Sequence, residues 1–186
     1  MESAIDIGII ELSEKVIVSD PCYERNDRGM VKDLTVKPGR YKTGIVYNDD
    51  EEWGCRIASL FAVHEDLKDP KLTDWKSVGV EVAVDSGQCG VFDDSIYPQL
   101  EDPAYTEMFY DENCSITLKK IPAGRLKNNK GAVSSSGYGD GVYELFAVYE
   151  NGECVALMLD FQLVKISEIA EIISSALNTA ADVSIV

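Results

Sequence analysis

The sequence predicts a mainly β protein: a β-rich α+β single domain of mostly antiparallel sheet or sandwich, with few short helices and a C-terminal helix. Short apolar runs recur along the chain, turn residues separate them, and the strand–helix–strand rhythm of parallel sheets is absent. The 186 residues are 45 % apolar, enough for one sizeable core. We expect residues 1–165 to form one domain and residues 166–186 a helical extension packed on it.

The first half of the chain is read as four strands. Ile5–Leu12 and Lys15–Val18 predict a hairpin or a pair of edge strands, and Pro21 then ends the second run. Arg40–Tyr47 and Trp53–His64 predict a long hairpin. Neither face of the later strand is cleanly polar, so we expect both of its faces to be covered.

The middle of the chain mixes strand and helix signals. Trp75–Val84 predicts a strand whose return begins at Gly90–Phe92. Pro103 directly after Asp102 suits the first position of a short helix. Cys114–Ile121 predicts a further strand.

The end of the chain carries the clearest local signals. Val142–Glu150 and Glu153–Phe161 alternate on either side of Asn151-Gly152, a pair that favours a two-residue hairpin turn. Ser167 then predicts the cap of an amphipathic helix. We expect this helix to reach about Leu177, to lay its isoleucines on the domain or on a second copy of it, and to leave a final strand or frayed tail up to Val186.

Net charge limits the classes of partner. The formal charge is −16 and the isoelectric point about 4.3, so nucleic-acid phosphates and anionic membranes would repel the chain. A basic protein partner suits this charge, as does mimicry of nucleic acid, although solubility alone would also explain it. No apolar run has membrane-spanning length, and the start lacks the features of a signal peptide.

The cysteines indicate a reducing compartment. Their number is odd, they are dispersed, and none follows the Cys-x-x-Cys spacing of metal knuckles. We therefore predict a cytoplasmic protein with five free thiols: Cys22, Cys55, Cys89, Cys114 and Cys154.

Two glycine-rich turns, Val84–Asp94 and Ser134–Gly141, are the candidate site. Glycine and short polar residues bend the backbone sharply and leave donors and acceptors free. We expect the two turns to lie side by side at one end of the sheet and to form the main polar concavity. The candidate ligand- or partner-binding residues are Asp85, Ser86, Gln88, Asp93, Ser136, Tyr138 and Asp140.

The same turns supply candidate metal ligands: Asp85, Asp93, Asp94 and Asp140. Carboxylates with serine and backbone oxygens suit calcium or magnesium, but the spacing does not match an EF-hand loop. Aspartate and glycine also form turns for purely local reasons. We expect no metal or cofactor, with a divalent cation as the alternative.

The catalytic candidates are few, because His64 is the only histidine and Gly-x-Ser-x-Gly is absent. A cysteine–histidine pair would need His64 with Cys89 or Cys22, and the candidate hydroxyls are Ser86 and Ser136. Asp85 and Asp140 are the candidate acid and base.

Several motifs occur in a characteristic order. They are Ser19-Asp20-Pro21, Pro38-Gly39-Arg40-Tyr41, Trp53-Gly54-Cys55-Arg56-Ile57-Ala58, Val84-Asp85-Ser86-Gly87-Gln88-Cys89-Gly90 with Asp93, Ser135-Ser136-Gly137-Tyr138-Gly139-Asp140-Gly141, and Leu159-Asp160-Phe161. In this order the chain resembles the bacterial family catalogued as domain of unknown function 4241, over roughly Val16 to Phe161. The resemblance implies a shared fold and supplies no reaction, substrate or catalytic residue.

Two functions remain open. The first is a non-enzymatic acidic cytosolic binding protein, in its sharpest form an immunity-type or inhibitor protein that neutralises a basic partner. The alternative is a small hydrolase that uses an acidic rim of Asp85, Asp93 and Asp140, with or without a divalent metal. Self-association through the C-terminal helix is a further expectation.

Overall fold

The computed structural model describes residues 3–27, 29–52, 54–67, 71, 74–98 and 102–182. Trp53 and residues 183–186 of the predicted tail therefore lie outside the described residues.

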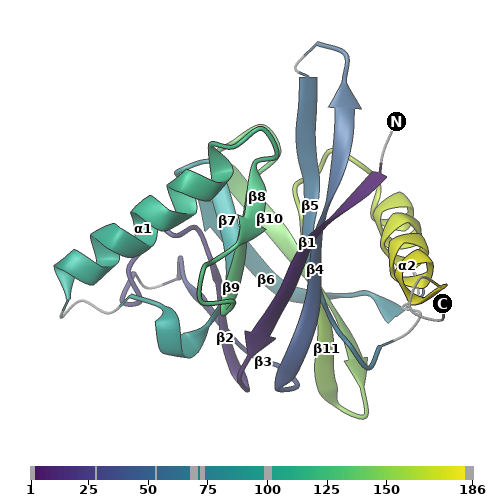
Figure 1. The fold of residues 1–186 in the computed structure, drawn as a ribbon, viewed down its shortest axis with the longest axis horizontal. Helices are drawn as coiled ribbons and strands as arrows, with labels where there is room; N and C mark the ends of the chain where they lie inside the picture. Colours follow the sequence, from purple (N-terminus) through teal and green to yellow (C-terminus); the bar gives the residue numbers. More distant parts are fainter. Residues whose placement is uncertain are drawn as a thin grey trace.

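Two antiparallel sheets form the centre of the molecule, with one helix on each outer side (Figure 1). The first sheet has the spatial order β1 (Ser3–Leu12), β4 (Gly39–Asp50), β5 (Gly54–His64), β11 (Glu153–Asp160), β10 (Gly141–Glu150) and β6 (Lys76–Val84). The second has the order β3 (Lys32–Thr35), β2 (Lys15–Ser19), β7 (Gln88–Asp93), β9 (Gly131–Ser135) and β8 (Ala123–Arg125). The helices are η2 (Asp94–Ile96), α1 (Pro103–Thr117) and α2 (Ile166–Asp182). The predicted β-rich architecture is confirmed.

The principal core lies between the two sheets. Val18 and Val91 of the second sheet pack in one buried cluster with Ile45, Leu60 and Leu145 of the first. Alternation along each strand sends the intervening residues to the outer faces. The two sheets are therefore joined by a single apolar layer.

Each outer face is covered by a helix. Phe61 of β5 packs with Ile169 and Ile173 of α2, so β5 is covered on both faces, as predicted. On the opposite side, Phe92 of β7 packs with Phe109 of α1. The result is a four-layer arrangement of helix, sheet, sheet and helix.

The predicted hairpin at Asn151-Gly152 is confirmed. β10 and β11 pair in antiparallel register across it. Asn151 has φ 52° and Gly152 has φ 85°, the positive values that a tight two-residue hairpin turn requires.

Two predicted pairings do not form, because the chain changes sheets at both places; of the alternative pair of edge strands, β1 is at an edge and β2 is not. β1 pairs with β4 in the first sheet, whereas β2 pairs with β3 and β7 in the second. Likewise β7 does not return along β6 but joins β2 and β9. Both β2 and β7 are buried along almost their whole length. Such strands need cover on both faces, which a local hairpin does not provide.

The strand predicted at Cys114–Ile121 is wrong, because α1 continues to Thr117. The predicted helix start is confirmed: Asp102 accepts a hydrogen bond from the Tyr105 backbone N–H at 3.0 Å, and Pro103 follows it. The helix persists because Phe109 and Ile116 lie on its buried face, against the second sheet.

The C-terminal helix is longer than predicted. It begins at Ile166, so Ser167 lies inside the helix and does not cap it, and it passes Leu177 to end at Asp182. Its isoleucines pack on the chain's own first sheet. Neither α1 nor α2, the helices of the described residues, is long and apolar enough to cross a membrane. All five cysteines are free thiols in the structure.

We expect Ile173→Ala to lower the free energy of unfolding by about 2–4 kcal/mol, because it removes fully buried methyl groups between α2 and the first sheet. Urea denaturation measures the change. Glu171→Ala, an exposed position on the same helix, is the matched control and should cost much less. An unchanged urea midpoint for Ile173→Ala would show that α2 does not pack on the sheet in solution.

Candidate functional site

The two glycine-rich turns lie side by side, as predicted, but the polar groove beside them is lined by other residues and not by Asp85–Asp93 or Ser136–Gly141, because the turns pack against each other. Val84 pairs with Gly141 at the end of the β6–β10 ladder, and Gln88 pairs with Ser135 at the start of the β7–β9 ladder. The Ser136 backbone N–H donates to the Gly87 carbonyl at 3.1 Å. One turn is therefore fixed against the other by backbone contacts on both sides.

A residue that we did not select as a candidate, Asp20, holds this arrangement together. Its side chain is fully buried where β2 ends. One carboxylate oxygen, Oδ2, accepts the backbone N–H groups of Asp85 and Ser86 at 2.9 and 2.6 Å. The other, Oδ1, accepts the Ser86 hydroxyl at 2.6 Å and the Cys22 backbone N–H at 2.8 Å. Four hydrogen-bond donors surround this buried carboxylate, and three of them belong to the first turn, so Asp20 holds that turn in place.

Two further candidates, Gln88 and Ser136, make hydrogen bonds that hold the fold together. The Gln88 amide donates to the Cys114 sulfur at 3.4 Å and accepts from the Thr117 hydroxyl at 3.0 Å, which ties β7 to α1. The Ser136 hydroxyl donates to the Gly139 carbonyl at 2.9 Å and closes its own turn. Ser86, Gln88 and Ser136 are thus structural in this arrangement. Tyr138 projects from the second turn with 61 % of its surface exposed.

The predicted acidic rim does not form. Asp85 and Asp140 are both exposed at the turns, but Asp93 is buried at the opposite end of β7, about 17 Å along the strand from Gln88. There Asp93 accepts hydrogen bonds from the Ser13 and Ser95 N–H groups at 2.5 and 3.0 Å. Burial opposes its ionisation, yet hydrogen bonds from Ser95 and Ser13 outweigh burial and lower the pKa of Asp93.

The candidate ligands of the alternative divalent-cation site, Asp85, Asp93, Asp94 and Asp140, do not converge either. Asp94 pairs with Arg25, away from both Asp85 and Asp140 at the turns. Within the described residues, no group of three or more histidine, cysteine or acidic side chains is placed to hold a metal ion.

The candidate cysteine–histidine pair does not form. Gly137 packs against Ile57 near the start of β5, whereas His64 is the last residue of that strand, roughly 20 Å away. The His64 ring lies edge-on to Tyr41, and its Nδ1 accepts the Asp66 N–H at 3.1 Å. Its role is structural.

The thiols near the turns are not activated. Cys89 is fully buried, and burial raises its pKa. Partial burial, followed by the carboxylates of Asp20 and Asp85, raises the pKa of Cys22 to about 12. Both thiols are therefore protonated at neutral pH, whereas a nucleophilic cysteine needs a depressed pKa.

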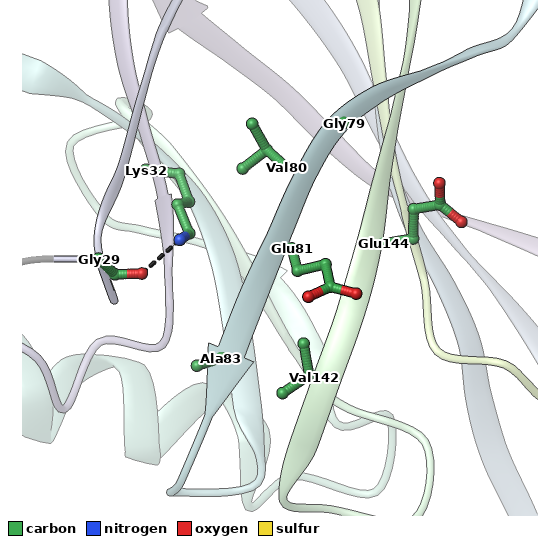
Figure 2. Close-up of a pocket in the computed structure, with 8 residues that line it drawn as sticks. All are labelled: Gly29, Lys32, Gly79, Val80, Glu81, Ala83, Val142 and Glu144. Atoms are coloured by element: carbon green, nitrogen blue, oxygen red, sulfur yellow. Dashed lines mark hydrogen bonds between the residues drawn. The ribbon is translucent and has the colours of Figure 1, made fainter.

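A groove of about 660 Å³ lies beside the turns, along the β6–β10 ladder. Figure 2 shows its two sides: Gly29 and Lys32 on one, and β6 with β10 on the other. The Lys32 ammonium is bound to the Gly29 carbonyl, as the dashed line marks. The β6 and β10 side is formed by Gly79, Val80, Glu81, Ala83, Val142 and Glu144.

Three carboxylates align across neighbouring strands here, and two of them, Glu81 and Glu144, line the groove. Glu144 of β10 stands directly opposite Glu81 of β6 on one side and Asp160 of β11 on the other. We call these three residues the acidic row. Like charges in such cross-strand positions repel one another. None of the ion pairs formed by the described residues involves a member of the row; the Ser77 hydroxyl, a neutral donor, binds Glu144.

The pKa of Asp160 is raised, chiefly by burial and to a smaller extent by repulsion within the row. Burial is the largest cause that raises its pKa, and the nearby Glu144 carboxylate adds to it. A hydrogen bond from the Gln162 N–H at 2.8 Å acts in the opposite direction without cancelling the effect. No ion pair in the described part of the chain neutralises the row, so an external cation would stabilise it.

Sequence reasoning missed all three members of the row. Alternation along β6 and β10 places Glu81 and Glu144 away from the core, and this could be predicted from the sequence. The pairing of Glu81 with Glu144 could not be predicted, because β6 and β10 are far apart in the chain. Of the predicted residues, Asp85 and Asp140 lie at the end of the same ladder, beyond the Val84–Gly141 pair.

Comparisons with known proteins identify no relative: no family model, no curated protein and no solved structure matches this chain. The resemblance of its motifs to a bacterial family of unknown function stays a prediction.

We expect Asp20→Asn to lower the free energy of unfolding by about 2–4 kcal/mol, because an amide NH₂ would face N–H donors that the carboxylate now accepts. Chemical denaturation measures the loss. Asp140→Asn, the same change at the exposed neighbouring turn, is the control and should behave as an ordinary surface substitution. Equal stability of the two variants would mean that Asp20 does not brace the turns.

We expect Asp160→Asn to stabilise the protein at neutral pH, because it removes a charge whose ionisation is opposed in the folded state. An acid with a raised folded pKa costs stability above that pKa and none below its unfolded value of about 3.9. The difference in urea midpoint should therefore shrink as the pH falls through the raised pKa of Asp160. A pH-independent difference would contradict the argument.

Proposed function

We propose that this protein is a non-enzymatic acidic binding protein of the bacterial cytosol. It neutralises a basic protein partner, in the manner of an immunity-type or inhibitor protein. The observation that carries the proposal is the acidic row, in which Glu81, Glu144 and Asp160 stand in register without an ion-pair partner among the described residues.

A partner's positive charge gains the most favourable interaction energy at the acidic row. A cation at the row relieves repulsion that already exists in the free protein, whereas a cation elsewhere only forms a new exposed pair of low value. The groove adds apolar contacts from Val80, Ala83 and Val142 beside the carboxylates. The formal charge of −16 steers a basic partner toward the surface at long range.

The hydrolase alternative rested on Asp85, Asp93 and Asp140 as one rim. Asp93 is at the other end of β7, so no observation favours that alternative.

The test compares two variants that remove the same charge. Glu81→Gln with Glu144→Gln neutralises the groove, and Glu107→Gln with Asp111→Asn neutralises two exposed positions on α1. Immobilised wild type and both variants are exposed to extract of the source cells, and captured proteins are quantified by mass spectrometry. We expect a basic protein to be retained by wild type and the α1 variant, and to be lost roughly tenfold or more from the groove variant.

Equal loss in both variants would mean that net charge alone drives capture, which contradicts a specific site. Equal retention by all three proteins would place the binding surface elsewhere.

A further inference from the structure

A second cavity, of about 550 Å³, lies where β3 approaches the β10–β11 hairpin. Its lining is largely apolar: Leu34, Val36 and Pro38 from β3 and the turn after it, and Tyr149 from β10. Tyr149 has 50 % of its surface exposed, so its ring is accessible at the cavity. Glu14 and Glu153 also line the cavity.

Carboxylates lie close together at this cavity, as they do at the first groove. Glu153 stands directly opposite Glu150 across the hairpin, so a second pair of like charges is held in cross-strand register. The Lys37 ammonium is bound to Asp66 at 2.7 Å and also attracts the Glu153 and Glu150 carboxylates, so it offsets part of their charge. The second cavity therefore combines an apolar lining with negative charge.

The two cavities share the same pair of strands. The first is lined by Lys32 of β3 and Glu144 of β10, and the second by Leu34 of β3 and Tyr149 of β10. Tyr149 is five positions after Glu144, which corresponds to about 17 Å along an extended strand. An extended segment of about six residues would reach from one cavity to the other.

We propose that one extended segment of the basic partner lies along β3, with a basic side chain at the acidic row and an apolar side chain in the second cavity. This inference rests on the proposed function and adds the apolar contact to it. Charge complementarity selects the occupant: a second copy of this chain would bring a further −16, and an anionic lipid surface would be repelled. Burial of the apolar side chain supplies affinity that exposed charge pairs do not.

The experiment uses two synthetic probe peptides and measures their affinity by calorimetry. Each carries lysines about six residues apart in a sequence that favours extended structure, and they differ only in having leucine or serine beside one of the lysines. Wild type should bind the leucine peptide about tenfold more tightly than the serine peptide, because a buried leucine contributes that much. Tyr149→Ser should abolish this preference, whereas Leu118→Ser, an 86 % exposed position after α1, should leave it intact.

The outcomes separate the two proposals. Equal affinity of wild type for both peptides, with both weakened by Glu81→Gln and Glu144→Gln, would overturn the apolar contact and leave the basic partner in place. A leucine preference that persists in Tyr149→Ser would place the apolar contact outside the second cavity and also overturn this inference. Affinities unaffected by the groove substitutions would overturn both proposals.

Discussion

The buried carboxylate of Asp20 is the interaction on which the rest of the arrangement depends. It accepts four hydrogen bonds and so fixes the turn at which the chain leaves the first sheet and enters the second. A charge buried without these donors would cost several kcal/mol, roughly the margin by which a domain is stable. The turn that Asp20 holds directly follows β6, whose ladder with β10 forms one side of the groove.

The acidic side chains fall into two groups with opposite energetics. Asp20 and Asp93 are buried and fully provided with donors, so their charge holds loops and sheets together. Glu81, Glu144 and Asp160 are aligned without an ion-pair partner among the described residues, and burial, with a smaller addition from Glu144, raises the pKa of Asp160. Stability explains the first group, whereas the second group is the surface to which the proposed function assigns a positively charged partner.

Local signals allowed much of the fold to be predicted. Alternation and Asn151-Gly152 define the last hairpin, and Asp102-Pro103 defines the start of α1, because these depend on neighbours in the chain. The changes of sheet after β1 and β6 depend on burial of β2 and β7 by distant residues, which no local pattern contains. The acidic row could not be predicted from the sequence for the same reason, because the register between β6 and β10 is set by the tertiary structure.

The most direct measurement of the central claim is an NMR titration of the side-chain carboxyl groups, with and without a lysine-rich probe peptide. We predict that Asp160 titrates above the ordinary aspartate value of about 3.9 in the free protein, and that the peptide lowers its pKa while exposed carboxyls on α1 stay unchanged. A pKa of Asp160 at the ordinary aspartate value, unchanged by the peptide, would be the contrary result. It would contradict the claim that the row carries charge that a basic partner could neutralise.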